Sequence, residues 1–111
     1  MREKIKVYYG KFHLGTLKYV DERYEYNSSA EEQEALKVHA LDFSEYRELI
    51  ASKQKKSKKL FAFFVKIINQ IKQREDLMQQ IAYEGADDYD LLVNYSKLKQ
   101  YENDFHFAKE N

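Results

Sequence analysis

The sequence predicts an α+β domain in which a small N-terminal antiparallel β-sheet, a meander, is followed by a mainly helical part. Residues 5–26 alternate apolar and polar side chains with the period of two that is typical of strands. Residues 60–81 place apolar side chains at the spacing of a helix. The chain has 111 residues, a length that favours one domain over residues 1–111.

Two turns divide the N-terminal region into three strands. Gly10–Lys11 and Asp21–Glu22 interrupt the alternation, and each pair begins with a residue type that favours tight turns. The third run carries Tyr24 and Tyr26. Because strands joined by short turns pair antiparallel, we expect a three-stranded meander.

The stretch GKFHLGT spaces Gly10 and Gly15 as a phosphate-binding P-loop spaces its glycines. A P-loop then needs a lysine and a helix N-terminus to hold phosphate, but Thr16 follows and the strand period continues to Tyr19. We therefore predict a turn at Gly10–Lys11 and a β-bulge or close backbone approach at Gly15. The alternation places Phe12, Leu14 and Thr16 on one strand face, against His13, Gly15 and Leu17.

A helix start follows the meander. Ser29 and Glu32 form the S-x-x-E pattern of a capping box and open an acidic, helix-prone stretch. Residues 37–43 are ambiguous, because they read either as a strand or as the approach to a second helix capped by Asp42. Both interpretations stay open.

Further boundary signals occur in the second half of the chain. Asn69–Gln70 is a candidate break within residues 60–81, and Gly85 is a candidate C-terminal helix cap. Asp87 precedes the short helical pattern DYDLLVNYS. The tail alternates around Phe105–Phe107 and favours a last strand.

Composition excludes several classes of protein. Nineteen basic and 19 acidic side chains give zero net charge, so a general attraction to nucleic acid or to anionic membranes is not indicated. Without cysteine the chain forms no disulfide and no thiolate metal site, and we expect it in the cytoplasm. The longest apolar run, Leu60–Val65, is too short to span a bilayer, so no membrane association is expected.

Candidate catalytic and metal-binding groups are sparse. His13, His39 and His106 do not have metal-ligand spacing, and we expect neither a metal nor a cofactor. The acidic cluster of Asp87, Asp88 and Asp90 is explained by helix capping, with a small hydrolase or transferase as the competing hypothesis. No nucleophile motif is present, so we expect no enzymatic activity.

The lysine tract Lys53–Lys59 offers a second hypothesis for function. Its five lysines could contact phosphates, which would make the chain a small nucleic-acid-binding module. No aromatic or arginine residue is interleaved to contact bases, and a short run of charge is usually a solvated loop. Direct nucleic-acid binding is therefore the alternative rather than the expectation.

The apolar arc of the 60–81 helix is wider than a surface helix requires. Its core stripe consists of Leu60, Phe64, Ile67 and Ile71. Phe61, Val65 and Ile68 extend the arc to about 200°, against about 100° for an ordinary surface helix. The helix is either sunk deep in a small core or contacts another protein through these residues. We predict that Phe61, Val65 and Ile68 bind a partner, with Tyr8 and Lys11 as weaker candidates.

Several short motifs together resemble the N-terminal subdomain of HipA-type kinases. They are Gly15-Thr16-Leu17, Tyr24-Glu25-Tyr26, Phe63-Phe64, Arg74–Leu77 and Asp88–Leu92, with Phe105–Phe107 as the closing strand. The chain departs from the family where FFVKIINQI lacks a proline, where KVHALDF and the lysine tract replace a serine- and leucine-rich strand, and where YENDFHF replaces a glycine-rich motif.

This resemblance implies a HipA N-terminal subdomain-like fold and a role as a binding protein. The 111 residues match the subdomain without the kinase core, as do the HipS proteins of three-part HipBST toxin–antitoxin systems. By this resemblance the partner is a HipT-like serine/threonine kinase, with a HipB-like DNA-binding protein in the same complex. The expected function is to bind and restrain that kinase toxin.

Overall fold

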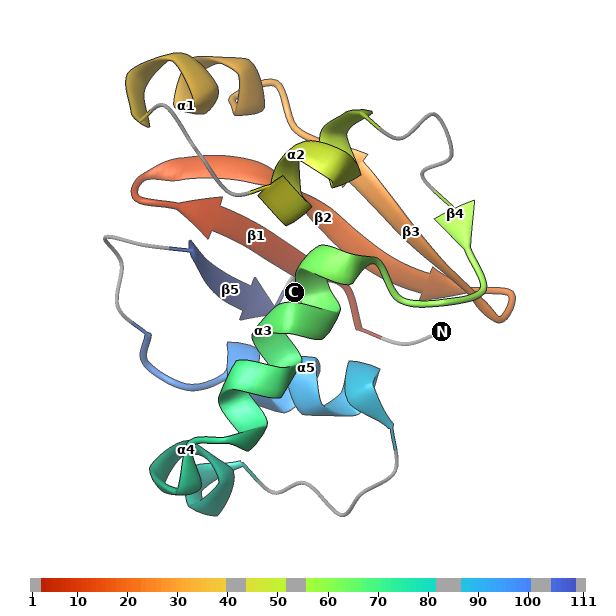
Figure 1. Ribbon diagram of the computed structural model, residues 1–111, viewed down its shortest axis with the longest axis vertical. Coiled ribbons are helices and arrows are strands. Elements are labelled where there is room, and N and C mark those ends of the chain that lie inside the picture. The colour runs from red at the N-terminus through yellow and green to blue at the C-terminus, as the bar shows by residue number, and fades with distance from the viewer. Residues whose placement is uncertain (1–2, 40–43, 52–55, 82–86, 101–104, 110–111) are drawn as a thin grey trace.

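A five-stranded antiparallel sheet forms one layer of the molecule (Figure 1). The computed structural model describes residues 3–39, 44–51, 56–81, 87–100 and 105–109. The strands are β1 (Ile5–Tyr9), β2 (Phe12–Val20), β3 (Arg23–Ser28), β4 (Lys56–Ser57) and β5 (Phe105–Lys109). Their order across the sheet is β4-β3-β2-β1-β5, so the last strand returns to pair with the first.

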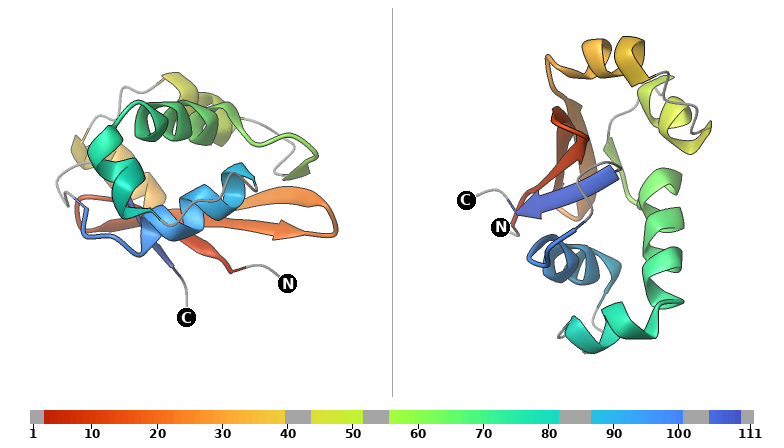
Figure 2. Two further views of the ribbon diagram at one scale, coloured as in Figure 1. Left: turned by 90° about the horizontal axis from the view of Figure 1, so that it is seen from below. Right: turned by 90° about the vertical axis from the view of Figure 1, so that its left-hand side faces the viewer.

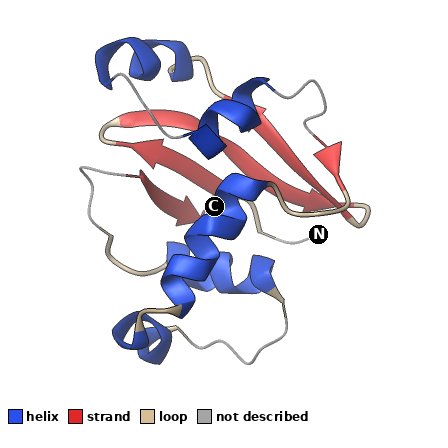
Figure 3. Cartoon of the chain, in the orientation of Figure 1, coloured by secondary structure: helices blue, strands red, loops and turns tan. Residues whose placement is uncertain are grey.

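The helices form the second layer. They are α1 (Glu32–His39), α2 (Ser44–Ala51), α3 (Ala62–Lys72), α4 (Glu75–Gln80) and α5 (Asp88–Ser96). Figure 2 shows α2 and α3 on one side of the sheet, and no helix of the described segments covers the other side. Helix α5 contacts the covered side through Tyr89, whose ring packs on Tyr19 of β2 and Tyr24 of β3. The mixture of helices and antiparallel strands in Figure 3 confirms the predicted α+β class.

The predicted three-stranded meander is confirmed, and backbone geometry explains its turns. Gly10 has φ 56°, in the left-handed region that glycine tolerates. Asp21 and Glu22 have φ 53° and 62°, as in the type I′ turn whose twist matches that of the flanking strands. The GKFHLGT stretch is therefore a hairpin turn followed by a strand.

A β-bulge in β2 changes which side chains share a face. Val7 pairs with Gly15 and Tyr8 pairs with His13, so Leu14 is an extra residue without a partner on β1. The regular alternation predicted for this strand is therefore wrong beyond Leu14. Phe12, Leu14 and Leu17 are all buried, while His13 and Thr16 come within 3.4 Å of each other on the opposite face.

The prediction of a bulge or close approach at Gly15 is confirmed in both respects. Tyr26 on β3 lies directly over this glycine, and a Cβ atom at Gly15 would be 2.4 Å from the Tyr26 hydroxyl oxygen. It would also be 2.6 Å from the carbonyl oxygen of Asn27. A side chain at position 15 is therefore incompatible with the position of the Tyr26 ring.

The Tyr26 hydroxyl begins a buried chain of hydrogen bonds that ties the first two helices to the sheet. Tyr46 on α2 donates to Oε2 of Glu32 on α1 at 2.7 Å, and Tyr26 is 2.9 Å from the Tyr46 oxygen. Because Tyr46 uses its proton on Glu32, Tyr26 is the donor in the second bond. Burial raises the pKa of both tyrosines, so both remain neutral donors.

This chain of hydrogen bonds replaces the capping box predicted at Ser29. The Ser29 hydroxyl accepts from the Glu31 N–H at 3.2 Å, but α1 begins at Glu32, two residues later than a cap at Ser29 predicts. The Glu32 carboxylate bonds to Tyr46 instead of reaching back to Ser29, and it is only 3% exposed. The Ser29 backbone N–H donates instead to the carbonyl of Leu14 at 2.8 Å, and its hydroxyl donates to the carbonyl of His13. Ser29 thus satisfies two carbonyls at the bulge.

The later helices follow the predicted pattern with one shifted boundary. The predicted break at Asn69–Gln70 is wrong, because α3 continues to Lys72 and α4 starts at Glu75. Asp87 caps α5, accepting from the N–H of Asp90 at 2.8 Å. Helix α1 reaches His39, which excludes a strand over residues 37–39. Asp42 and Gly85 lie outside the described residues.

A side chain closes the outer edge of β5. The Gln100 amide accepts from the Phe107 N–H at 2.8 Å and donates to the Phe107 carbonyl at 2.9 Å. The same amide donates to the carbonyl of Tyr95 on α5 at 2.9 Å. Gln100 therefore fills backbone positions that would otherwise accept another strand.

We predict that Gly15→Ala destabilises the fold by about 1–3 kcal/mol, because the new methyl group overpacks the site occupied by Tyr26. Urea denaturation measures this change. Thr16→Ala is the matched control on the opposite face and should cost about 0.5 kcal/mol or less. Equal losses for the two variants would contradict the close packing of Gly15 against Tyr26.

We also predict that Tyr46→Phe is more destabilising than Tyr26→Phe. Removing the Tyr46 hydroxyl leaves the buried Glu32 carboxylate without this donor, at a cost of about 1–3 kcal/mol. Tyr26→Phe removes only the terminal donor and should cost about 0.5–1.5 kcal/mol. Thermal and urea unfolding of both variants measure the order, and a larger loss for Tyr26→Phe would rule out the proposed direction of donation.

Candidate binding surfaces

Helix α3 is held by neighbours on several sides, which explains its wide apolar arc. It contacts α2, α4 and α5. Phe64 packs on Tyr26 of β3 and Phe107 of β5, with ring centroids 5.8 and 6.3 Å apart. Phe63 packs edge-on against Tyr46 of α2 at 5.0 Å. Most of the arc therefore belongs to the protein's own core.

This packing separates the three predicted contact residues of α3. Ile68 is 1% exposed, so its assignment to a partner surface is wrong for this structure. The prediction failed because helical phase places Ile68 beside Val65 but does not reveal the neighbouring helices that cover it. Phe61 is half-buried next to Phe64, and Val65 is 37% exposed. Within the described residues, Val65 is the one large hydrophobic side chain that is exposed.

Tyr8 and Lys11, the weaker candidates, lie away from Phe61 and Val65. Tyr8 alternates with the buried Val7, so its side chain points to the sheet face that α3 does not cover. Lys11 is exposed in the β1–β2 turn, with its Nζ 5.7 Å from the centroid of the Phe12 ring. The structure therefore does not join all five predicted residues into one surface.

The uncovered side of the sheet, called the open face below, is a second candidate surface. Tyr8 lies there between His13 on β2 and His106 on β5, its partners in the strand register. The imidazole Nε2 of His13 is 2.9 Å from the carbonyl oxygen of Gly15, and Glu31 accepts from the His13 backbone N–H at 3.3 Å. Sequence reasoning missed this grouping, because nothing local predicts that β5 pairs with β1.

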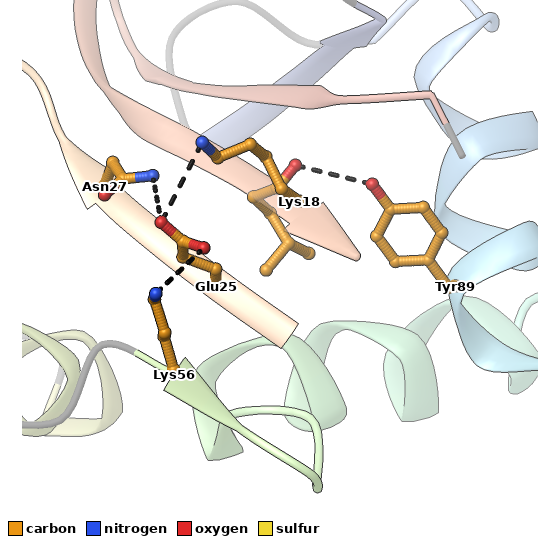
Figure 4. Close-up of polar contacts among 6 residues, drawn as sticks. Lys18, Glu25, Asn27, Lys56 and Tyr89 are labelled. Carbon is orange, nitrogen blue, oxygen red and sulfur yellow. Dashed lines mark hydrogen bonds and ion pairs between the residues drawn. The ribbon is translucent and has the colours of Figure 1, made fainter. Parts of the chain in front are cut away.

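Charged side chains occupy the other end of the open face (Figure 4). Glu25 lies between two lysines, 3.8 Å from the Nζ of Lys18 and 4.0 Å from the Nζ of Lys56. Asn27 donates to the same carboxylate at 3.2 Å. The figure also shows the Tyr89 hydroxyl pointing to the Leu17 carbonyl oxygen, 3.4 Å away. The same hydroxyl donates to the Glu3 carbonyl, so Tyr89 connects α5 to the covered side of the sheet through both carbonyls.

The acidic cluster has structural partners. Asp87 caps α5, and Asp88 pairs with Lys72 of α3 at 3.1 Å, which links the two helices. In the part of the chain that the structure describes, no group of three or more His, Asp or Glu side chains could hold a metal ion. The geometry gives no support to the hydrolase or transferase hypothesis.

The lysine tract is only partly described. Lys53 and Lys55 lie outside the described residues. Lys56 belongs to β4 and pairs with Glu25, while Lys58 and Lys59 are exposed. Of the described lysines in the tract, Lys56 thus lies at the edge of the open face.

Comparison of the chain with protein-family models, with curated proteins and with solved structures finds no match. Among the helices that the structure describes, none combines the length and the apolar character needed to cross a bilayer.

Aspartate substitutions distinguish the buried from the exposed part of the predicted α3 surface. Ile68→Asp should destabilise the fold by about 3 kcal/mol or more, because it buries an unpaired charge. Val65→Asp should change stability by about 0.5 kcal/mol or less. Circular dichroism during thermal unfolding measures both, and similar losses would contradict the burial described here.

Proposed function

We propose that this chain is a non-catalytic binding domain that docks on a HipT-like serine/threonine kinase and restrains it, as the antitoxin part of a HipBST-type toxin–antitoxin system. A HipB-like DNA-binding protein would belong to the same cytoplasmic complex. The observation that carries the proposal is the apolar pair at the start of α3, where Val65 is exposed and Phe61 is only half-buried. Contiguous exposed apolar surface on a small domain commonly marks a protein contact, and Phe61 and Val65 lie one helical turn apart, with the Val65 N–H donating to the Phe61 carbonyl.

The order of elements supports the same proposal. The meander, the helix with Phe63-Phe64, the helix starting after Arg74, the α5 helix and the closing strand follow one another as in the resembling subdomain. The closing strand β5 pairs with β1, so the first and last elements lie together in one sheet.

The simplest way for this domain to restrain the kinase is to occupy a surface beside its nucleotide cleft. Docking would remove the exposed parts of Phe61 and Val65 from water, which contributes about 25 cal/mol for each Å² of apolar surface. A domain seated beside the nucleotide cleft would alter closure of that cleft or access to it. The chain has no tryptophan, so an indole plug is not the means.

Copurification with the kinase tests the proposal. The partner to use is a HipT-like kinase that lacks this subdomain, produced together with the chain. We expect a stable complex, and we expect Val65→Asp to weaken it by about tenfold or more, equivalent to about 1.4 kcal/mol.

Gln70→Asp is the matched control. Gln70 is exposed on the same helix but lies about 140° around the axis from Val65. It should leave the affinity unchanged within about twofold. A folded Val65→Asp variant that binds at full strength would refute this docking surface, and absence of any complex with the unaltered chain would refute the kinase partner.

A further inference from the structure

Three aromatic rings form a row across the open face. His106 stacks on Tyr8 with ring centroids 5.2 Å apart and planes only 8° apart. His13 contacts Tyr8 from the neighbouring strand at 5.2 Å, with a tilt of 37°. All three residues are half-buried, on a face of the sheet that no described helix covers. The row crosses the adjacent strands β5, β1 and β2.

Positive charge accompanies the ring row. Lys6 lies two residues before Tyr8 on β1, about 6.8 Å along the strand. Lys18 and Lys56 lie further along the face, on either side of Glu25. Arg23 lies two residues before Glu25 on β3, so its side chain is on the same face. The outward side chains of the strands thus carry four cations and one carboxylate. Glu31 adds a second carboxylate beside His13, because it accepts from the His13 backbone N–H. Cations on the open face therefore outnumber carboxylates by four to two, although the whole chain has no net charge.

This combination matches the chemistry of a single nucleic-acid strand. Unpaired bases offer flat π-surfaces that stack on aromatic side chains, and their phosphates are attracted to lysine and arginine. Sheet surfaces that bind RNA commonly stack two or three bases on strand aromatics. An acidic peptide would use the cations but not the rings. Binding to a bilayer requires apolar side chains that insert into it, and the aromatic and charged side chains described above do not form such an apolar surface.

We infer that the open face binds single-stranded nucleic acid, with bases on the row of His106, Tyr8 and His13 and phosphates along Lys6, Lys18 and Lys56. Helix α3 lies on the other side of the sheet (Figure 2), so this site is separate from the proposed kinase contact. Nucleic-acid binding to the open face and kinase binding to α3 can therefore be tested independently.

Fluorescence anisotropy with labelled oligouridylate and oligothymidylate of about 12 nucleotides tests the inference on the full chain. We expect saturable binding at about 50 mM salt, and a slope of log affinity against log salt of about −2 to −3 for three or four phosphate contacts. Tyr8→Ala should weaken binding by about five- to 100-fold through lost stacking. Tyr8→Phe keeps the ring and should bind within about twofold of the unaltered chain.

A charge-matched pair of double variants locates the site. Lys6→Ala with Lys18→Ala should weaken binding and make the salt slope shallower by about 1.4. Lys66→Ala with Lys72→Ala removes the same charge from α3, on the other side of the sheet, and should leave the slope unchanged. Equal effects of the two pairs would overturn the inference.

Competition with other polyanions tests whether the open face recognises bases or only negative charge. A polyglutamate peptide or vesicles containing phosphatidylserine should compete poorly, and duplex DNA should bind more weakly than the single strand. If these ligands compete fully, or if Tyr8→Ala has no effect, the open face does not recognise bases. Absence of saturable binding at about 50 mM salt would also overturn the inference.

Discussion

The β-bulge at Leu14 determines which side chains face each side of the sheet. Inserting one residue keeps Leu14 and Leu17 in the core and places Gly15 beneath Tyr26. It also leaves His13 on the opposite side, beside Tyr8. The bulge exposes the carbonyls of His13 and Leu14 to Ser29, which donates a hydrogen bond to each of them. Without the bulge, the buried chain through Tyr26 and the ring row on the open face would not form together.

The two faces of the sheet therefore have different roles. One face is covered by helices, and its hydrogen-bond chain ends at the buried Glu32 of α1. The other face keeps aromatic and positive side chains in contact with water. Zero net charge indicated no electrostatic partner, but net charge is a sum over the whole surface and conceals a positive face. Both proposed contacts, at α3 and at the open face, use parts of the molecule that the core does not need.

Local patterns predicted much of the fold, whereas contacts distant in sequence decided the errors. The turns at Gly10 and Asp21 and the cap at Asp87 were predictable because each depends on neighbouring residues. The burial of Ile68 was not predictable from local sequence, because it depends on the helices that pack around α3. The partners of Tyr8 were equally hidden, because His106 is 98 positions away and joins the row only through the β1–β5 pairing. Residues of the two candidate surfaces were thus predictable only where their environment is set within a single helix or turn.

Proton NMR of the free chain tests the central role of the bulge most directly. We expect nuclear Overhauser contacts between the ring protons of His13 and Tyr8, and an upfield shift of the Gly15 Hα protons under the Tyr26 ring. Contacts from the His13 ring to Leu17 or Tyr26 instead would mean that β2 keeps its regular alternation. That result would contradict both the core and the open face described here.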